Sequence, residues 1–188
     1  MRHPLTKLLA TAMLLWASAL WANPYADAVG LFRNAGQSGH YFGHCYGYAV
    51  FPTIGKAGLV VGGAHGSGRV FVHGKYVGNT TMNQLSAGLQ AGGQAYSQIV
   101  FFEDRRAFEQ FTKGNFEFGA DVDAVAITAA AGGSIGTTGA SAEASGGMKD
   151  ALTAGRYYKG LAVFTIVKGG AMYQATVAGQ KFSYTPKA

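Results

Sequence analysis

Glycine interrupts apolar runs every few residues in the stretch Tyr46-Gly-Tyr-Ala-Val-Phe-Pro-Thr-Ile-Gly-Lys-Ala-Gly-Leu-Val-Val-Gly-Gly-Ala-His-Gly-Ser-Gly68. Runs rich in Val, Ile and Phe favour β-strands. Glycines inside strands indicate bulges, tight curvature or close backbone approach. We expect Leu59–Gly63 to form a strand, and Pro52 and Gly55 to break the pattern before it. The stretch therefore predicts a strongly curved, barrel-like sheet.

Two further strands are predicted on the C-terminal side of this stretch, at Arg69–His73 and Gln98–Phe102. Between them, Gly74-Lys75 and Gly78-Asn79 carry the residue types of turns. Five glycines of this β region are expected to mark bulges, tight curvature or close backbone approach: Gly62, Gly63, Gly88, Gly92 and Gly93.

Helical periodicity appears on both sides of this β region. Apolar or small residues recur at steps of three and four from Tyr25 to Tyr46, which predicts one helix with a single apolar face. A compact helix is predicted at residues 104–113, with Asp104 as its N-cap and Gly114 ending it.

The C-terminal part of the chain predicts more β structure. Leu161–Lys168 is apolar on both faces and is expected to be a central strand, and Gly169-Gly170 then predicts a two-residue hairpin leading into Ala171–Val177. The small-residue tract Ala124–Gly147 is read either as a flexible loop or as a strand pair. Together the elements predict one α+β, mostly antiparallel, glycine-rich domain over residues 23–188.

Composition supports a folded domain and excludes several classes of protein. The 188 residues are 48% hydrophobic and 13% charged, which argues against disorder. The 29 glycines follow no three-residue period, which excludes collagen. The single cysteine, Cys45, excludes an internal disulfide framework.

The first 22 residues have the pattern of a secretory signal peptide. Arg2, His3 and Lys7 precede an apolar run, and small residues follow it, so that cleavage after Ala22 or after Ala19 is predicted. A lipoprotein is not expected, because Cys45 lies far from either cleavage site. The protein is therefore expected to be exported and to be periplasmic or envelope-associated.

Removal of the leader takes Arg2 and Lys7 from the 15 basic residues and leaves all 9 acidic ones, so the mature chain has a net charge of +4. A mildly cationic exported protein points to an anionic lipid, a polysaccharide or an acidic partner. Nucleic acid is not an expected partner, because the chain is exported and contains no basic block.

Motifs that carry chemistry are not convincing in this sequence. Gly132-Gly-Ser-Ile-Gly136 matches a nucleophile elbow, but no histidine follows Ser134 as that arrangement requires. His40, His44 and Cys45 lack the further ligands of a structural zinc site. We therefore expect a binding module rather than an enzyme, with no cofactor, metal site or catalytic residue.

Three ordered segments resemble the signatures of the SYLF-domain family. The opening signature is the stretch 46–68 quoted above. The middle one is Gln90-Ala-Gly-Gly-Gln-Ala-Tyr-Ser-Gln-Ile-Val-Phe-Phe102, and the last comprises Lys168-Gly-Gly-Ala-Met-Tyr and Gly179-Gln-Lys-Phe-Ser-Tyr184. The resemblance extends from about residue 28 to residue 185. It implies a lipid-binding module, with phosphoinositides as the ligands of eukaryotic members, some of which also bind actin, and it implies no enzymatic activity.

The resemblance also implies an N-terminal amphipathic helix as the membrane-contacting element. Residues 25–45 depart from that pattern, because they are weakly amphipathic and carry a single arginine, Arg33. For an exported protein, phosphoinositide binding transfers as a chemical preference for anionic phosphate headgroups.

We therefore predict non-enzymatic binding to anionic phospholipid headgroups at a membrane surface. The predicted headgroup-binding residues are Arg33, Lys56, Arg69, Lys75, Arg156 and Lys159, and the predicted membrane-contact aromatics are Tyr41, Phe42, Tyr157 and Tyr158.

Two alternatives remain open at this stage. One is a structural or protein-interaction module of the envelope, as a homo-oligomer or with a protein partner. The other is a small outer-membrane barrel, against which stand the charged helix at 104–113 and the doubly apolar strand at 161–168.

Overall fold

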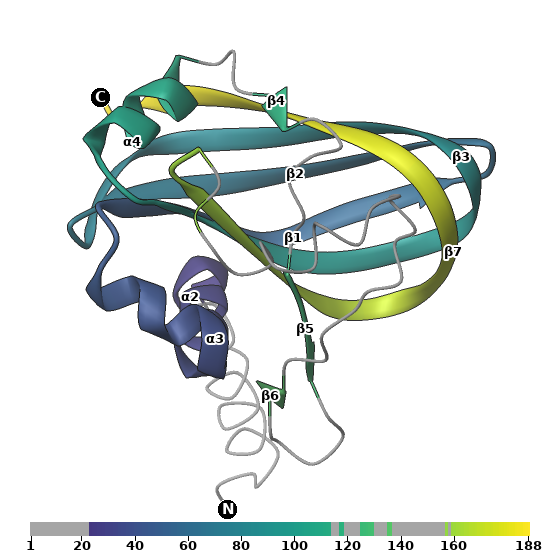
Figure 1. Cartoon of the computed structure of the whole chain (residues 1–188), viewed down its shortest axis with the longest axis horizontal. Coiled ribbons are helices and arrows are strands. Elements are labelled where there is room, and N and C mark those ends of the chain that lie inside the picture. The colour runs from purple at the N-terminus through teal and green to yellow at the C-terminus, as the bar shows by residue number, and fades with distance from the viewer. Residues whose placement is uncertain (1–22, 114–116, 119–124, 130–134, 137–156, 158) are drawn as a thin grey trace, which may run out of the picture.

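A computed structural model describes residues 23–113, 117–118, 125–129, 135–136, 157 and 159–188 of the chain. The fold is α+β: a mostly antiparallel sheet with a few short helices (Figure 1). The helices are α2 (Pro24–Asn34), α3 (Gly36–Gly39), the 3₁₀-helix η2 (His40–Gly43) and α4 (Arg105–Thr112). The strands are β1 (Gly47–Gly58), β2 (Val61–Val72), β3 (Lys75–Phe102), β4 (Glu117–Phe118), β5 (Val125–Ala129), β6 (Ile135–Gly136) and β7 (Leu161–Pro186).

Two very long strands organise the sheet. The 28-residue β3 pairs with β2 from Lys75 to Ala87 and with β1 from Gly92 to Phe102. The 26-residue β7 runs antiparallel to β3 along almost its whole length. Because β1 and β2 are the two arms of one hairpin, β3 must bend between its two halves. Figure 1 shows β3 and β7 curving together at the end of the molecule opposite the helices, on the right of the view.

The expected barrel-like closure is not confirmed, because the sheet is not closed. Its strand order is β1-β2-β3-β7-β5-β6, with β1 also pairing with β3 and β4 pairing with β7. Beyond β7, the described strands are short: β5 pairs with β7 in parallel near Phe164, and β4 pairs with it near Lys181. The curvature that the glycines predicted is present, and Gly92 at the bend adopts a φ of 125° that disfavours other residues.

Several expected turns are wrong, because the strands run through them. Gly169-Gly170 lies inside β7, opposite Ala95 and Gln94 of the curved strand β3, so these glycines permit curvature rather than a reversal. Gly78-Asn79 lies inside β3. Pro52 is accommodated where the register of β1 shifts between Val50 and Ile54, which is a bulge rather than a strand end.

Other predicted boundaries shift by a few residues. The predicted strand Leu59–Gly63 is divided, because Leu59 and Val60 form the tip of the β1–β2 hairpin and β2 begins at Val61. His73-Gly74 makes the next turn, with both residues at positive φ, so Lys75 already belongs to β3. The predicted helix Tyr25–Tyr46 is interrupted at Ala35, whose extended ψ of 118° ends α2.

The other local predictions hold. Asp104 caps α4 by accepting a hydrogen bond of 2.8 Å from the Ala107 backbone N–H. Leu161–Lys168 is interior to the sheet, with β3 on one side and β5 on the other. Gly114 and the tract Ala124–Gly147 fall largely outside the described residues.

Two apolar clusters hold the helices to the sheet. On the inner side of the curved sheet, α4 packs its Phe111 ring against Phe102 and Phe182 at centroid distances of 4.9 Å and 5.2 Å. On the outer side, α2 and η2 cover Phe101 and Phe164. Gly68 allows β2 to approach β1, because a Cβ atom there would lie 2.7 Å from the Phe51 ring.

The interior becomes polar toward the bend of β3. The Gln98 side chain donates to Gln180 across 3.2 Å, and Gln180 donates to Gln84 across 3.0 Å. Gln84 and Gln98 are 7% and 0% exposed, so this chain of amides satisfies groups that would otherwise be costly to bury. The apolar core therefore ends well before the tip of the β1–β2 hairpin.

Candidate functional site

The predicted headgroup-binding cations do not gather on one surface. Arg33 and Lys75 are exposed at the helical end of the molecule, and Lys159 lies beside α4 through its neighbour Gly160. Lys56 points into the sheet and is only 9% exposed. Arg156 lies outside the described residues. The structure thus brings Arg33, Arg69 and Lys75 into one end of the molecule and separates Lys56 from them.

Arg69 packs the helical segment onto the sheet through its guanidinium group, and Arg33 packs α2 against η2 within the helical segment. The Arg69 guanidinium carbon lies 4.2 Å from the Tyr25 ring centroid of α2 and 5.3 Å from that of Tyr76. The Arg33 guanidinium lies 5.0 Å from the Phe42 ring. Such cation–π contacts stabilise the packing. Headgroup binding by these arginines stays a prediction.

The predicted membrane-contact aromatics lie between the helical segment and the sheet. Tyr41 stacks on Phe101 at 5.2 Å and meets the Tyr157 ring edge-on at 5.1 Å. Phe42 packs edge-on against Phe101 at 5.0 Å. Tyr158 lies outside the described residues. These rings are half-buried in the outer apolar cluster, and membrane contact by them stays a prediction.

The Tyr157 hydroxyl provides a test of that packing. It is buried without a hydrogen-bond partner among the described residues, and burial is the first cause that raises the pKa of Tyr157 above its ordinary value of 10.0. Tyr157→Phe keeps the ring and removes the orphaned hydroxyl, so we expect stability to rise by up to about 1–3 kcal/mol. Thermal unfolding followed by circular dichroism measures this.

The stability of the same variant is also expected to depend less on alkaline pH than that of the wild type. In the wild type the unfolded chain ionises Tyr157 above pH 10.0, while the folded chain keeps it neutral, so this contribution to stability is lost as pH rises further. Tyr157→Phe should remove that dependence. A loss of more than about 1 kcal/mol at neutral pH would instead mean that the hydroxyl makes a stabilising hydrogen bond.

The four long strands carry positive charge and no negative charge. Strands β1, β2, β3 and β7 contain no Asp or Glu, and their Lys and Arg residues are Lys56, Arg69, Lys75, Lys168 and Lys181. The described acidic residues lie on α2, on or beside α4, and on β4, where Glu117 faces Lys181 across the ladder. Two of them, Asp104 and Glu109, already pair with Arg106 and Arg105 of α4. The four long strands therefore carry a net positive charge, and Lys56, which is buried, adds little to their surface.

The tip of the β1–β2 hairpin exposes a cluster of aliphatic side chains. Leu59, Val60 and Val61 are 71%, 69% and 68% exposed, and Leu85 of β3 is 77% exposed. Val61 pairs with Ala87, two residues along β3 from Leu85, so the four side chains form one patch. We call these four residues the aliphatic tip.

Glycines surround the aliphatic tip and leave it uncovered. Gly58 pairs with Gly62 of β2 and with Gly92 of β3. Leu85 has Gly63 opposite it on one side and Gly179 of β7 on the other. Because glycine has no side chain, none of these neighbours shields the aliphatic groups from solvent.

Lys168 and Lys181 lie behind the aliphatic tip on the two sides of the curved sheet. Lys181 of β7 pairs with Asn83 of β3, which in turn pairs with His65 of β2, three residues after Gly62. The Asn83 and His65 side chains are hydrogen-bonded across 2.8 Å. Lys168 precedes Gly169, which pairs with Ala95 of β3, and Ala95 pairs with Gly55 of β1. The Lys168 ammonium donates a hydrogen bond to the Thr53 hydroxyl across 3.1 Å. Both lysines are exposed. With a rise of about 3.3 Å per residue, both lysines lie roughly 10–13 Å behind the hairpin end of the tip, and Lys181 lies roughly 7 Å behind Leu85.

The described residues give no sign of a metal centre or a spanning helix. No group of three His, Cys, Asp or Glu side chains gathers in the described part of the chain. Among these same residues, no helix has the length and apolar character needed to cross a membrane. Burial raises the pKa of Cys45, which keeps the thiol protonated.

The fold and the surface together define a class of protein: an α+β domain with a curved sheet whose four long strands contain no acidic residue and which ends in an aliphatic tip. The chain belongs to the Ysc84 family, described as Las17-binding protein actin regulators, whose sequence pattern matches residues 83–186, more than half of its length. This confirms the resemblance to SYLF-domain proteins.

The chain is also similar to a curated protein. Beta cell expansion factor A from Aeromonas veronii is 29% identical over 164 residues, which cover 85% of this chain and 54% of the relative. The chain therefore spans about half the length of that protein. No solved structure matches the chain significantly.

Sequence reasoning missed the aliphatic tip but had signals for it. Leu59-Val60-Val61 is an aliphatic run between glycines, and residues 47–102 contain no acidic residue. The run reads as a buried strand from its composition alone. Only the pairing of Gly58 with Gly62 shows that it is a hairpin end.

Proposed function

We propose that this protein binds the surface of anionic phospholipid bilayers without catalysing a reaction. The observation that carries the proposal is the charge of the four long strands, which contain no acidic side chain and expose Lys75, Lys168 and Lys181. Membership in a family known for lipid binding and actin regulation supports it.

Electrostatics favour an anionic over a zwitterionic surface. Each Lys or Arg near an anionic leaflet contributes about 1 kcal/mol, and the attraction falls off within a Debye length of about 8–10 Å. Because the four long strands contain no carboxylate side chain, none of their side chains repels the negative charge of such a leaflet. An exported protein would meet phosphate headgroups of the phosphatidylglycerol kind at the bacterial envelope, and the predicted leader supports that location.

Flotation with vesicles tests this proposal. Protein recovered after export, with its N-terminus read by mass spectrometry, is mixed with vesicles of pure phosphatidylcholine or with 30% phosphatidylglycerol added. We expect binding to the anionic vesicles at least tenfold tighter than to the zwitterionic ones, and weaker binding as salt rises. Equal binding to both would overturn the anionic preference, and no binding to either would overturn the function.

Protein binding is the second candidate function, and the family description favours it because it names a protein partner, Las17, for the family. In that case the exported protein would retain a partner from an envelope extract in a manner insensitive to both salt and lipid. The same vesicle assay then separates the two functions, since a pure protein-interaction module would not float with vesicles.

A further inference from the structure

We infer that the aliphatic tip is the part of the protein that enters the bilayer, with Lys168 and Lys181 at the level of the headgroup phosphates. This inference rests on the proposed function and specifies its site and orientation. It assigns membrane contact to a hairpin end rather than to the helical segment 24–43.

Exposure on this scale calls for an apolar partner. The four side chains of the tip are 68–77% exposed, whereas the other large exposed hydrophobic residues in the described part of the chain, Leu31 and Val167, are 40% and 39% exposed. Contiguous exposed apolar groups mark interaction sites, whereas single ones are normal. The clustering of Leu59, Val60, Val61 and Leu85 thus sets the tip apart from the rest of the described surface.

Charge complementarity identifies the partner as an anionic bilayer. An amphipathic element at a membrane buries its apolar part about 5–10 Å into the boundary between headgroups and acyl chains, and its lysines remain at the headgroups. Lys168 and Lys181 are set back from the hairpin end of the tip by roughly 10–13 Å, which matches that arrangement. Glu117 is the one described acidic residue at their level in the sheet, opposite Lys181.

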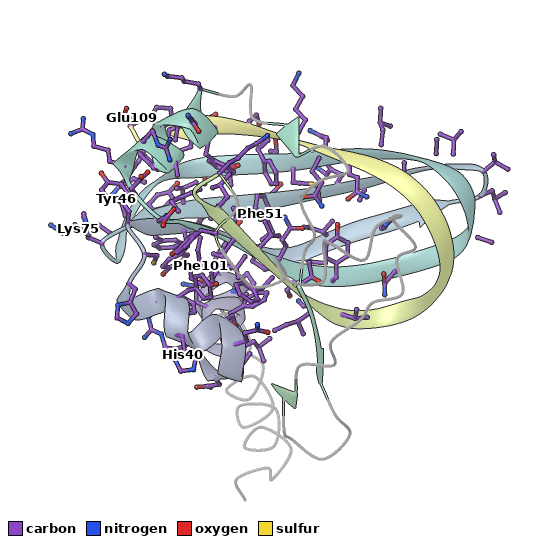
Figure 2. The ribbon with its side chains drawn as sticks, viewed as in Figure 1. His40, Tyr46, Phe51, Lys75, Phe101 and Glu109 are labelled. Carbon is purple, nitrogen blue, oxygen red and sulfur yellow. The ribbon has the colours of Figure 1, made fainter. Side chains whose placement is uncertain are left out.

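The opposite end of the molecule is unsuited to the same contact. Figure 2 shows Lys75 and Glu109 at the end away from the bend of β3, where cations and carboxylates are mixed. β2 separates the two ends by 11 residues, or roughly 36 Å. When the tip is in the bilayer, Lys75 is therefore about 23–26 Å from the headgroups, which is two to three Debye lengths, and contributes little.

Substitution of the tip tests the inference. Leu59→Ser/Val61→Ser removes apolar side chains that are already exposed in the folded protein, so the fold should persist. The matched control is Leu31→Ser, which removes an exposed aliphatic group from α2 at the opposite end. Vesicle partition coefficients are measured for both with 30% phosphatidylglycerol, and circular dichroism verifies the fold.

We expect the double variant to partition about tenfold less or weaker still, because burial of even one Leu or Val contributes at least this factor. Leu31→Ser should change the partition less than twofold. If the wild type binds and the double variant partitions equally well, the inference that the tip enters the bilayer is overturned, while the proposed function stays intact. Loss in Leu31→Ser alone would assign the contact to α2. A wild type that does not bind at all overturns the proposed function itself.

Discussion

Reversing the two lysines behind the aliphatic tip, in the variant Lys168→Glu/Lys181→Glu, is expected to weaken binding to anionic vesicles by about 100-fold at low salt. The double variant changes the local charge by four units, and each unit near an anionic leaflet is worth about 1 kcal/mol. The full sum exceeds 100-fold, but both side chains are exposed and salt screens them. Vesicle partition measured at two salt concentrations gives the effect and its screening.

A matched reversal at the far end distinguishes position from net charge. Lys75→Glu/Lys187→Glu makes the same change in total charge on two exposed side chains near the start of β3, at the end away from the tip. We expect it to weaken binding less than fivefold, because those residues lie about two Debye lengths or more from the headgroups. Equal losses in the two double variants would mean that net charge, and not the placement of Lys168 and Lys181, governs binding.

The largest expected loss of stability follows from Phe182→Ala. Phe182 is fully buried in the inner apolar cluster, with its ring 5.2 Å from Phe111 of α4 and 5.7 Å from Phe51 of β1. Truncation of a buried Phe costs about 3–5 kcal/mol. Since a domain is stable by only about 5–15 kcal/mol, this is a large share of the total. Chemical denaturation measures the change in the free energy of unfolding.

Thr185→Ala is the control for this experiment, because Thr185 is an exposed residue of the same strand. We expect its effect to stay within about 0.5 kcal/mol. A loss below about 1 kcal/mol in Phe182→Ala would contradict the packing, since it would mean that α4 and β7 do not share a close-packed core.

Local signals were sufficient where a single element determines the outcome. Asp104 predicts the start of α4 because its side chain satisfies a backbone N–H three residues on, and this needs no distant partner. The doubly apolar run Leu161–Lys168 predicts an interior strand because both its faces are covered. Family membership could likewise be predicted from three ordered sequence segments, and the family match confirms it.

The lengths of the strands could not be predicted from local pattern. Gly78-Asn79 and Gly169-Gly170 have the composition of turns, yet each lies within a strand that is paired with its neighbour. A glycine pair permits both a reversal and a bend, and only the long pairing of β3 with β7 selects the bend. Pairing between residues as distant as Gly78 and Pro186 is invisible to any local window.

The candidate site was missed for a related reason. Composition alone makes Leu59-Val60-Val61 a buried strand, because aliphatic residues usually lie inside. Their exposure follows from their place at the end of a hairpin, which is a property of the whole sheet. Similarly, Lys56 reads as a surface cation, but the alternation of β1 turns its side chain inward.

The most direct test of the account places a fluorescent probe on the aliphatic tip. The chain contains two tryptophans, Trp16 and Trp21, and both are replaced by Phe so that an introduced tryptophan is the only one. Leu59→Trp then reports on the tip, and Gln110→Trp reports on the exposed face of α4 at the other end.

On addition of vesicles with 30% phosphatidylglycerol, we predict that the tip probe shifts to shorter emission wavelength and is quenched by lipids brominated on their acyl chains. The probe on α4 should show neither change. The opposite pattern, with the α4 probe quenched and the tip probe unchanged, would contradict the account.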